Sequence, residues 1–253
     1  MAQSRGARRI LQQLSPRATR ALEILQGREQ AKIDINASFA AALEIEPLTF
    51  LVFACLGTVQ GKEELVLDLS VTIFMKKFRR QAEQLLQALV QAEIPAQLLI
   101  LLPDLEPRRT WGWQVPQGDL SGLCHMMIED AASSLPDGWT VRLWSGIEAG
   151  VSMSTDYDEA LRWAMASAPP LILRDEIRFF QELGTRHPNI LTQGRPNELA
   201  RRQIAAYAHE GRLLELHYPK TILLQADTPV ERKDVMFNQL RRQPLAIVHP
   251  FAR

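Results

Sequence analysis

Cysteine is scarce in this chain, and long apolar runs are missing. The 253 residues include two cysteines, Cys55 and Cys124, which are too few for a disulfide framework and form no Cys-x-x-Cys pair. No run of about 20 apolar residues is present, so no membrane-spanning helix is expected. Residues 1–20 are basic but lack the apolar segment of a secretory signal. We therefore expect a soluble protein of a reducing compartment, the cytoplasm.

An excess of charge of either sign is also missing. The 29 basic side chains are balanced by 29 acidic ones. This balance argues against bulk non-specific binding of nucleic acid, although a local basic face is still compatible with it. Hydrophobic residues make up 46% of the chain and supply a sizeable core, so global disorder is not expected.

The sharp motifs of common enzyme classes are absent as well. The chain has neither the Gly-x-Gly-x-x-Gly fingerprint of dinucleotide sites nor the Gly-x-x-x-x-Gly-Lys-[Ser/Thr] loop that holds nucleotide phosphates. It also lacks the Gly-x-Ser-x-Gly elbow and the His-Glu-x-x-His zinc pair, and its five histidines do not have metal-site spacing. The sequence therefore predicts no cofactor and no metal, and no motif fixes a reaction.

What the chain does contain is a short apolar run, residues 96–104, that organises the rest. Pro95 and Pro103 punctuate its ends, and the run is too short for most helices. Because polar residues do not alternate with apolar ones, we expect a strand that is covered on both faces, as in a parallel sheet between helices. Its far end carries Asp104, where open α/β sheets bind ligands.

Strand-like and helix-like segments alternate along the chain, which favours an α/β layered fold. We expect further strands at residues 47–57, 139–145, 220–226 and 245–248, the last stopped by Pro250. We expect helices at residues 16–25, 74–91, 119–132, 155–166, 171–183, 197–216 and 230–241, with Gly184 ending the fifth of these before the long helix. The prediction is a mostly parallel sheet between helices with an added helical flank. A basic helical arm, residues 1–46, would pack on one α/β domain, residues 47–253.

Tyr207 and Glu210 are the strongest catalytic candidates. They lie three residues apart on a predicted helix and therefore share a face with each other, and with Leu199 and Leu214. A carboxylate that points toward the body needs a partner or a function. It could act as a general acid or base, or bind an amine. Alternatively, it could form an ion pair with a nearby arginine, beside a tyrosine of the core.

Other candidates follow predicted strands, where α/β sites form. Asp104, Trp111 and Trp113 follow the central strand, and Asp227 follows a later one, so we expect these four to bind substrate. The alternatives are a loop that packs its own tryptophans and a turn that caps the next helix. Cys55, at the end of the first long strand, is either a nucleophile or a buried apolar residue.

Basic residues gather in two places that could bind a phosphate backbone. The alternative is an ordinary solvated helix face. The candidates are Arg5, Arg8 and Arg9 near the N-terminus, and Lys76, Lys77, Arg79 and Arg80 at the start of the helix that leads into the central strand.

The order of these elements resembles that of the tRNA-dependent cyclodipeptide synthases. That family has an early strand with a nucleophilic serine, a basic helix, a strand ending in Ile-Pro-Asp, and a late helix with a tyrosine four residues before a glutamate. Here residues 50–57 take the early strand, residues 101–104 read LLPD, residues 207–210 read YAHE, and residues 244–248 resemble the closing strand. Two features depart from the pattern. The serine is missing, and the tyrosine and glutamate are three residues apart.

The resemblance implies a Rossmann-like fold and a biosynthetic transferase that uses aminoacyl-tRNA to form a peptide bond. It implies that Tyr207 and Glu210 hold the aminoacyl amine and relay protons. Cys55 or Thr58 would replace the serine, or the covalent step would be lost. Residues 212–227 also resemble the end of isocyanide synthases, which implies a small-molecule enzyme without tRNA as the alternative. A non-catalytic binding protein is the third reading.

Overall fold

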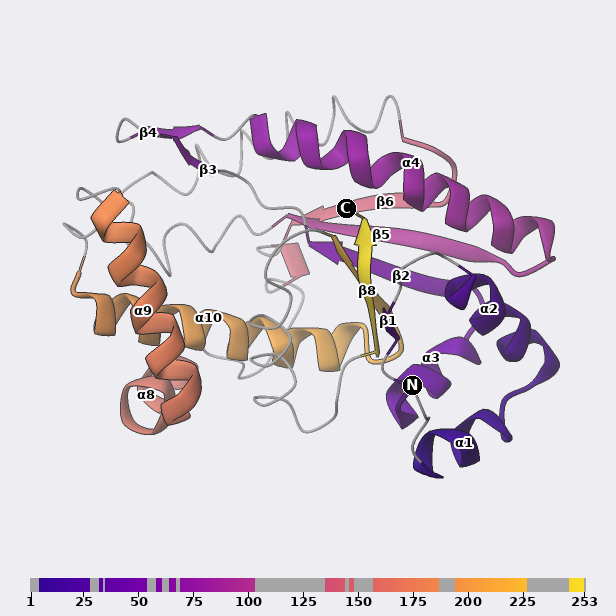
Figure 1. Cartoon of the computed structure of the whole chain (residues 1–253), viewed down its shortest axis with the longest axis horizontal. Helices are drawn as coiled ribbons and strands as arrows, with labels where there is room; N and C mark the ends of the chain where they lie inside the picture. Colours follow the sequence, from indigo (N-terminus) through magenta and orange to yellow (C-terminus); the bar gives the residue numbers. More distant parts are fainter. Residues whose placement is uncertain are drawn as a thin grey trace.

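The fold of the chain is seen in a computed structural model (Figure 1). The structure describes residues 5–27, 32–33, 35–53, 58–60, 64–66, 69–102, 135–143, 146–147, 157–186, 194–226 and 246–252.

A six-stranded sheet forms the middle layer, with strand order β1-β8-β7-β2-β5-β6. Its neighbours pair in parallel except at one edge, where β1 is antiparallel to β8. The strands are β1 (Lys32–Ile33), β2 (Leu48–Phe53), β5 (Ala96–Leu102), β6 (Trp139–Leu143), β7 (Ile222–Ala226) and β8 (Ala246–Ala252). A separate antiparallel hairpin pairs β3 (Thr58–Gln60) with β4 (Glu64–Val66). The predicted mostly parallel α/β sheet is confirmed.

The apolar run at residues 96–104 forms β5, a parallel strand between β2 and β6. Leu99 pairs with Leu51 on one side and Thr140 on the other. Leu98 and Ile100 belong to one buried cluster, whereas Leu99 and Leu101 belong to another. Successive side chains point to opposite faces of a sheet, so both faces of β5 are buried. This is why polar residues do not alternate with apolar ones in the run, as expected.

Seven described helices surround the sheet. They are α1 (Arg5–Leu11), α2 (Pro16–Gln26), α3 (Ala37–Leu43), α4 (Leu69–Gln91), α8 (Tyr157–Ser167), α9 (Pro170–Arg186) and α10 (Pro196–His217). The expected helical flank is confirmed by α8, α9 and α10: in Figure 1, α10 lies below the sheet, and α8 and α9 lie at its left-hand end. None of the helices in the described ranges is long and apolar enough to span a membrane.

The first face of the sheet is covered by α2, α3 and α4. Leu85 and Leu89 of α4 share a buried cluster with Phe50 and Ile100 of the sheet. Helix α2 begins with Ser15 as its N-cap, and the Ser15 side chain accepts a hydrogen bond from the backbone N of Ala18 at 3.1 Å. The same cluster contains residues of α2 and α3, so the N-terminal segment contributes to the main core: Ala18, Ala21, Leu22, Leu25, Phe39, Ala42 and Leu43.

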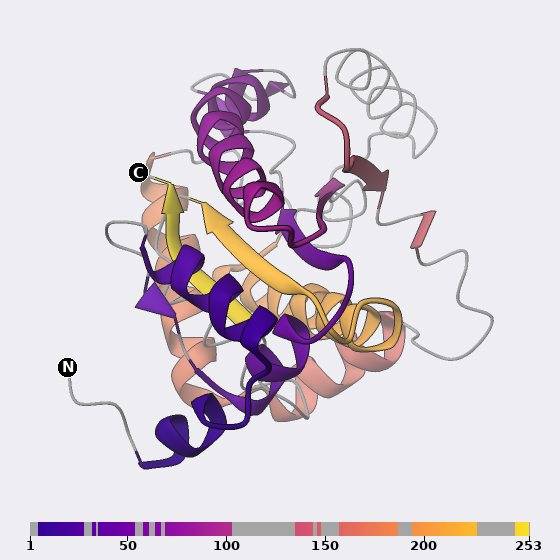
Figure 2. The same cartoon turned by 90° about the vertical axis from the view of Figure 1, so that its right-hand side faces the viewer.

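The second face is covered by α10 and α8. Ile204 and Leu213 of α10 share a buried cluster with Leu51 and Leu223 of the sheet. In Figure 2, α4 and α10 lie on opposite sides of the strands. Helices on both faces of a parallel sheet make this a three-layered, doubly wound α/β fold.

Two predicted ends are wrong. Gly184 does not end α9, which continues to Arg186. Gly184 is buried, so packing outweighs its weak helix propensity. Pro250 does not end β8, which continues to Ala252. The register with β7 shifts there, since Leu224 pairs with Val248 but Ala226 pairs with Ala252. A bulge of this kind tolerates a residue without a backbone N–H.

Other elements were missed or begin earlier than predicted. The helix expected from residue 74 begins at Leu69, and α1, α3, β1 and the β3–β4 hairpin were not predicted. Short elements carry too few residues for a clear hydrophobic period. The helices predicted at residues 119–132 and 230–241 lie outside the described residues.

Candidate functional site

The strand order creates a topological switch point between β2 and β7. From β2 the sheet continues through β5 to β6, and from β7 it continues through β8 to β1. In open α/β sheets, ligands bind at such a point, beyond the carboxyl ends of the strands. In Figure 1 these ends point toward the side occupied by β3, β4 and α9.

Three of the predicted site residues follow the three adjacent strands β7, β2 and β5. Asp227 comes directly after Ala226, and Cys55 and Asp104 come two residues after Phe53 and Leu102, respectively.

Their side chains lie outside the described residues, as do Trp111 and Trp113. Their roles therefore stay predictions.

Helix α10 brings Tyr207 and Glu210 to this region. Pro196 occupies its first turn, and the Glu198 carboxylate accepts a hydrogen bond from the backbone N of Arg195 at 3.2 Å, so the helix has a well-defined start. Tyr207 lies about ten residues, or ~15 Å, before the helix ends at His217, where the chain turns into β7. It is therefore level with the carboxyl half of β7.

Both side chains are buried: Tyr207 is 3% exposed and Glu210 is 8% exposed. Tyr207 belongs to the cluster that contains Leu51 and Leu101, near the carboxyl ends of β2 and β5. The inward orientation expected for this pair is thus what the structure has. A carboxylate at this depth requires polar or charged neighbours.

Gln203, one turn before Tyr207, completes a polar stripe along α10. Its Nε2 donates a hydrogen bond to the Tyr207 hydroxyl at 2.7 Å, and Gln203 itself is 7% exposed. The bond fixes the tyrosine rotamer and leaves the hydroxyl proton to be donated elsewhere. Sequence reasoning missed Gln203, although its spacing of four from Tyr207 is a helical signal. Gln203, Tyr207 and Glu210 are called the α10 stripe below.

Two further buried polar residues flank the stripe. His209 is 1% exposed, and its ring meets Tyr157 of α8 edge-on, with centroids 6.2 Å apart. Glu176 of α9 is also 1% exposed and was not singled out from the sequence. It follows Ile172 and precedes Phe180 at spacings of four, on the face of α9 that packs on α10. The α10 stripe thus lies in an unusually polar part of the core.

Arginines tie α10 to α8 next to the α10 stripe. Nη1 of Arg201 donates to the carbonyl oxygens of Ala164 and Met165, at 2.6 and 2.7 Å, and so caps the C-terminal end of α8. Arg212 pairs with Glu159 of α8 at 3.6 Å. The latter contact gives Arg212 a partner outside the α10 stripe.

The two predicted basic groups are not brought together. Figures 1 and 2 show α1, which carries Arg8 and Arg9, at one end of the molecule, far from the start of α4. Arg8, Arg9 and Arg80 are exposed, whereas Nε of Arg79 is 2.7 Å from Oε1 of Glu83. Arg5 lies on α1, and Lys76 and Lys77 lie on α4. The start of α4 is at the same end of the molecule as the carboxyl ends of the strands.

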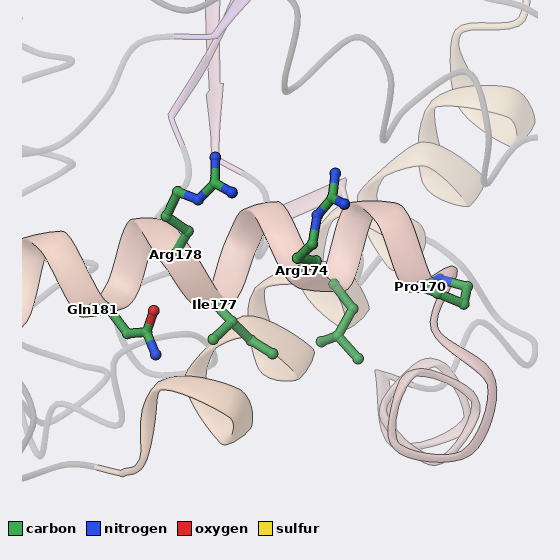
Figure 3. Close-up of a pocket in the computed structure, with 6 residues that line it drawn as sticks. Pro170, Arg174, Ile177, Arg178 and Gln181 are labelled. Carbon is green, nitrogen blue, oxygen red and sulfur yellow. The ribbon is translucent and has the colours of Figure 1, made fainter.

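Two surface pockets lie away from the α10 stripe. One, of about 400 Å³, lies along α9, where Arg174 and Arg178 point to the same side and Ile177 points away from them (Figure 3). Another, of about 340 Å³, lies at the amino ends of the strands, between Thr49 of β2 and the turn at Lys220. Neither is lined by Tyr207 or Glu210. In the described part of the chain, no three His, Cys, Asp or Glu side chains are grouped to hold a metal.

Comparison with known proteins gives a likeness of fold. No family model matches the chain, and no curated protein matches it. A CDPS from Fluoribacter dumoffii is 13% identical, with a TM-score of 0.49 over 86% of this chain and 95% of that chain. The PvcA protein from Pseudomonas aeruginosa is 16% identical, with a TM-score of 0.49 over 86% of this chain and 78% of that chain.

A cyclodipeptide synthase from Candidatus Glomeribacter gigasporarum, solved bound to Phe-tRNAPhe, is 12% identical. It matches over 80% of this chain and 87% of that chain, with a TM-score of 0.47.

Proposed function

We propose that this protein is a biosynthetic acyltransferase that forms a peptide bond from aminoacyl groups carried by tRNA, with its site at the crevice between β2 and β7. One observation carries the proposal: α10 buries a tyrosine and a carboxylate together, level with the carboxyl half of the sheet. Paired groups of this kind in a buried setting suit the binding and deprotonation of an amine.

The chemistry requires that protons move in two places. The amine of one aminoacyl group attacks the ester carbonyl of another, a C–N bond forms, and the ester C–O bond breaks. Glu210 would bind the ammonium group and take the proton that the nitrogen loses, and the Tyr207 hydroxyl would donate toward the carbonyl or the departing ribose oxygen. A water-excluding position strengthens both interactions.

A covalent intermediate would require a nucleophile at the end of β2. Cys55 is our candidate, because a thiolate at a strand end can take the acyl group from the ester and pass it to the amine. Thr58 is the alternative residue, and direct transfer between two bound aminoacyl groups is the alternative route. Replacement of Cys55 by alanine separates these: trapped acyl-enzyme would disappear if Cys55 is the nucleophile and persist if Thr58 is, whereas with direct transfer even the native chain would form none.

The proposed donor is an aminoacyl-tRNA, the ligand carried by the cyclodipeptide synthase from Candidatus Glomeribacter gigasporarum. Arg80 and the neighbouring basic residues at the start of α4 would contact its phosphates. Asp104, Trp111, Trp113 and Asp227 would line the pocket for the aminoacyl side chain.

The second candidate is a small-molecule enzyme on the same fold that uses no tRNA. The zero net charge of the chain favours it, since RNA-binding proteins usually carry a basic excess. In both candidate functions Tyr207 and Glu210 are the catalytic residues. The two therefore differ in the substrate, and identification of the substrate distinguishes them.

The test is product formation. The purified protein is incubated with tRNA charged with each amino acid, and cyclic and linear dipeptides are measured by mass spectrometry. We expect a dipeptide from the native chain and none from Glu210→Gln, with the melting temperature nearly unchanged because the change is isosteric. Glu215→Gln, on the same helix, is the matched control and should retain product.

A folded native protein that forms no dipeptide from any charged tRNA would overturn the proposal and favour the second candidate. Unfolding of Glu210→Gln would instead identify Glu210 as a structural ion-pair partner.

A further inference from the structure

The side-chain amide of Gln203 is satisfied at only one of its two ends within the described structure. Its Nε2 is used by the Tyr207 hydroxyl, at 2.7 Å. Its Oε1 is buried and has no hydrogen-bond partner among the described residues. A buried acceptor without a donor destabilises the folded protein, so we expect Oε1 to bind a donor that is not among these residues.

The place of this oxygen on α10 defines which donor it would meet. Residues 203, 207 and 210 follow one another at spacings of four and three, so the three side chains lie on one stripe of the helix. The stripe spans ~10 Å along the axis. An amide oxygen therefore precedes the tyrosine and a carboxylate follows it, and both accept hydrogen bonds.

We infer that Gln203 is a substrate-binding and positioning residue: its Oε1 accepts an N–H of a primary ammonium group while its Nε2 holds the Tyr207 hydroxyl in place. This inference rests on the proposed function and names a contact for the amine. An ammonium has three N–H donors and no acceptor, so it can supply the donor that Oε1 of Gln203 lacks.

The alternative occupant is a bound water, which also donates hydrogen bonds in buried polar sites. A water would make Gln203 a structural residue only. The two cases differ in one property. If Gln203 binds an ammonium group, its replacement lowers the affinity only for ligands that carry a free amine. If it binds a water, its replacement does not distinguish ligands with a free amine from those without one.

The experiment measures binding of L-leucinamide and L-phenylalaninamide, and of their N-acetyl counterparts, to the full-length protein by calorimetry. We expect the native chain to prefer the free amines, and Gln203→Met to lose about tenfold in affinity for them. The N-acetyl compounds should bind Gln203→Met and the native chain equally. Gln81→Met is the matched control, because Oε1 of Gln81 is likewise buried and lacks a partner in the described structure, but on α4.

Equal affinities of Gln203→Met and the native chain for the free amines would overturn the inference and leave a structural water as the explanation. If the native chain itself does not distinguish amine from N-acetyl compound, the inference also fails. Dipeptide formation from charged tRNA then decides separately whether the proposed function stands.

Discussion

At the scale of single side chains, the Tyr207 hydroxyl accepts a hydrogen bond from Gln203 at 2.7 Å. Both residues are almost fully buried, so neither can exchange its partner for bulk water. Leu199 and Leu214, which lie on the core side of the same helix, made the burial of Tyr207 and Glu210 predictable from the sequence. Gln203 was missed despite its spacing of four from Tyr207, because a glutamine on a helix is equally compatible with an exposed face.

The Gln203–Tyr207 bond should contribute to stability as well as to function. We predict that Tyr207→Phe lowers the free energy of unfolding by about 1–3 kcal/mol, since it leaves a buried amide donor without its acceptor. Gln203→Met should have a similar effect. The double variant should cost less than the sum, which urea unfolding of the four proteins measures as a coupling energy. Simple additivity would show that the two side chains do not interact in solution.

At the scale of elements, α10 is the long helix on which the second layer is built. It packs on the sheet through its C-terminal half and on α8 and α9. Long, strongly periodic elements such as α10 and β5 were read correctly from the sequence. The errors fall at Gly184 and Pro250, where residues that usually end an element are tolerated by burial and by a bulge.

Two arginines connect α10 to α8, and we predict that they contribute unequally. Arg201 donates two short bonds to backbone carbonyl oxygens, whereas Arg212 and Glu159 are both about half exposed. Arg201→Met should therefore destabilise the protein by about 1.5–3 kcal/mol, and Arg212→Met by less than about 1 kcal/mol. Hydrogen exchange of residues 157–167 reports the effect locally. Equal protection in the two variants would contradict the proposed role of Arg201 as a cap.

On the scale of the whole molecule, the sheet separates a layer that contains α2, α3 and α4 from a layer that contains α8 and α10. The mostly parallel sheet followed from unbroken apolar strands, which require cover on both faces. The order of the strands did not follow, since it depends on where each connection crosses. The pairing of β1 with β8 joins segments more than 200 residues apart, and no local pattern reports such a contact.

The ends of the molecule should differ in their contribution to RNA binding. Arg80 lies on the helix whose start is near the carboxyl edge, and Arg9 lies on α1 at the other end. We predict that Arg80→Glu weakens tRNA binding and reduces the salt dependence of log K by about one unit, and that Arg9→Glu changes it less. Filter binding across a salt series measures both. A larger effect from Arg9→Glu would move the RNA to the far end, and absence of binding by the native chain would remove RNA as a partner.

The pairing of β1 with β8 also has a consequence for the time course of folding during synthesis. Ile33 is made about 215 residues before its partner Val248. At ordinary rates of translation, synthesis of the residues between them takes roughly 10 to 40 s. Until then α2 and α3 lack part of the surface against which they pack, since Val248 belongs to their buried cluster. Helices α2 and α3 are thus made early, but they complete their packing only after β8 has been made.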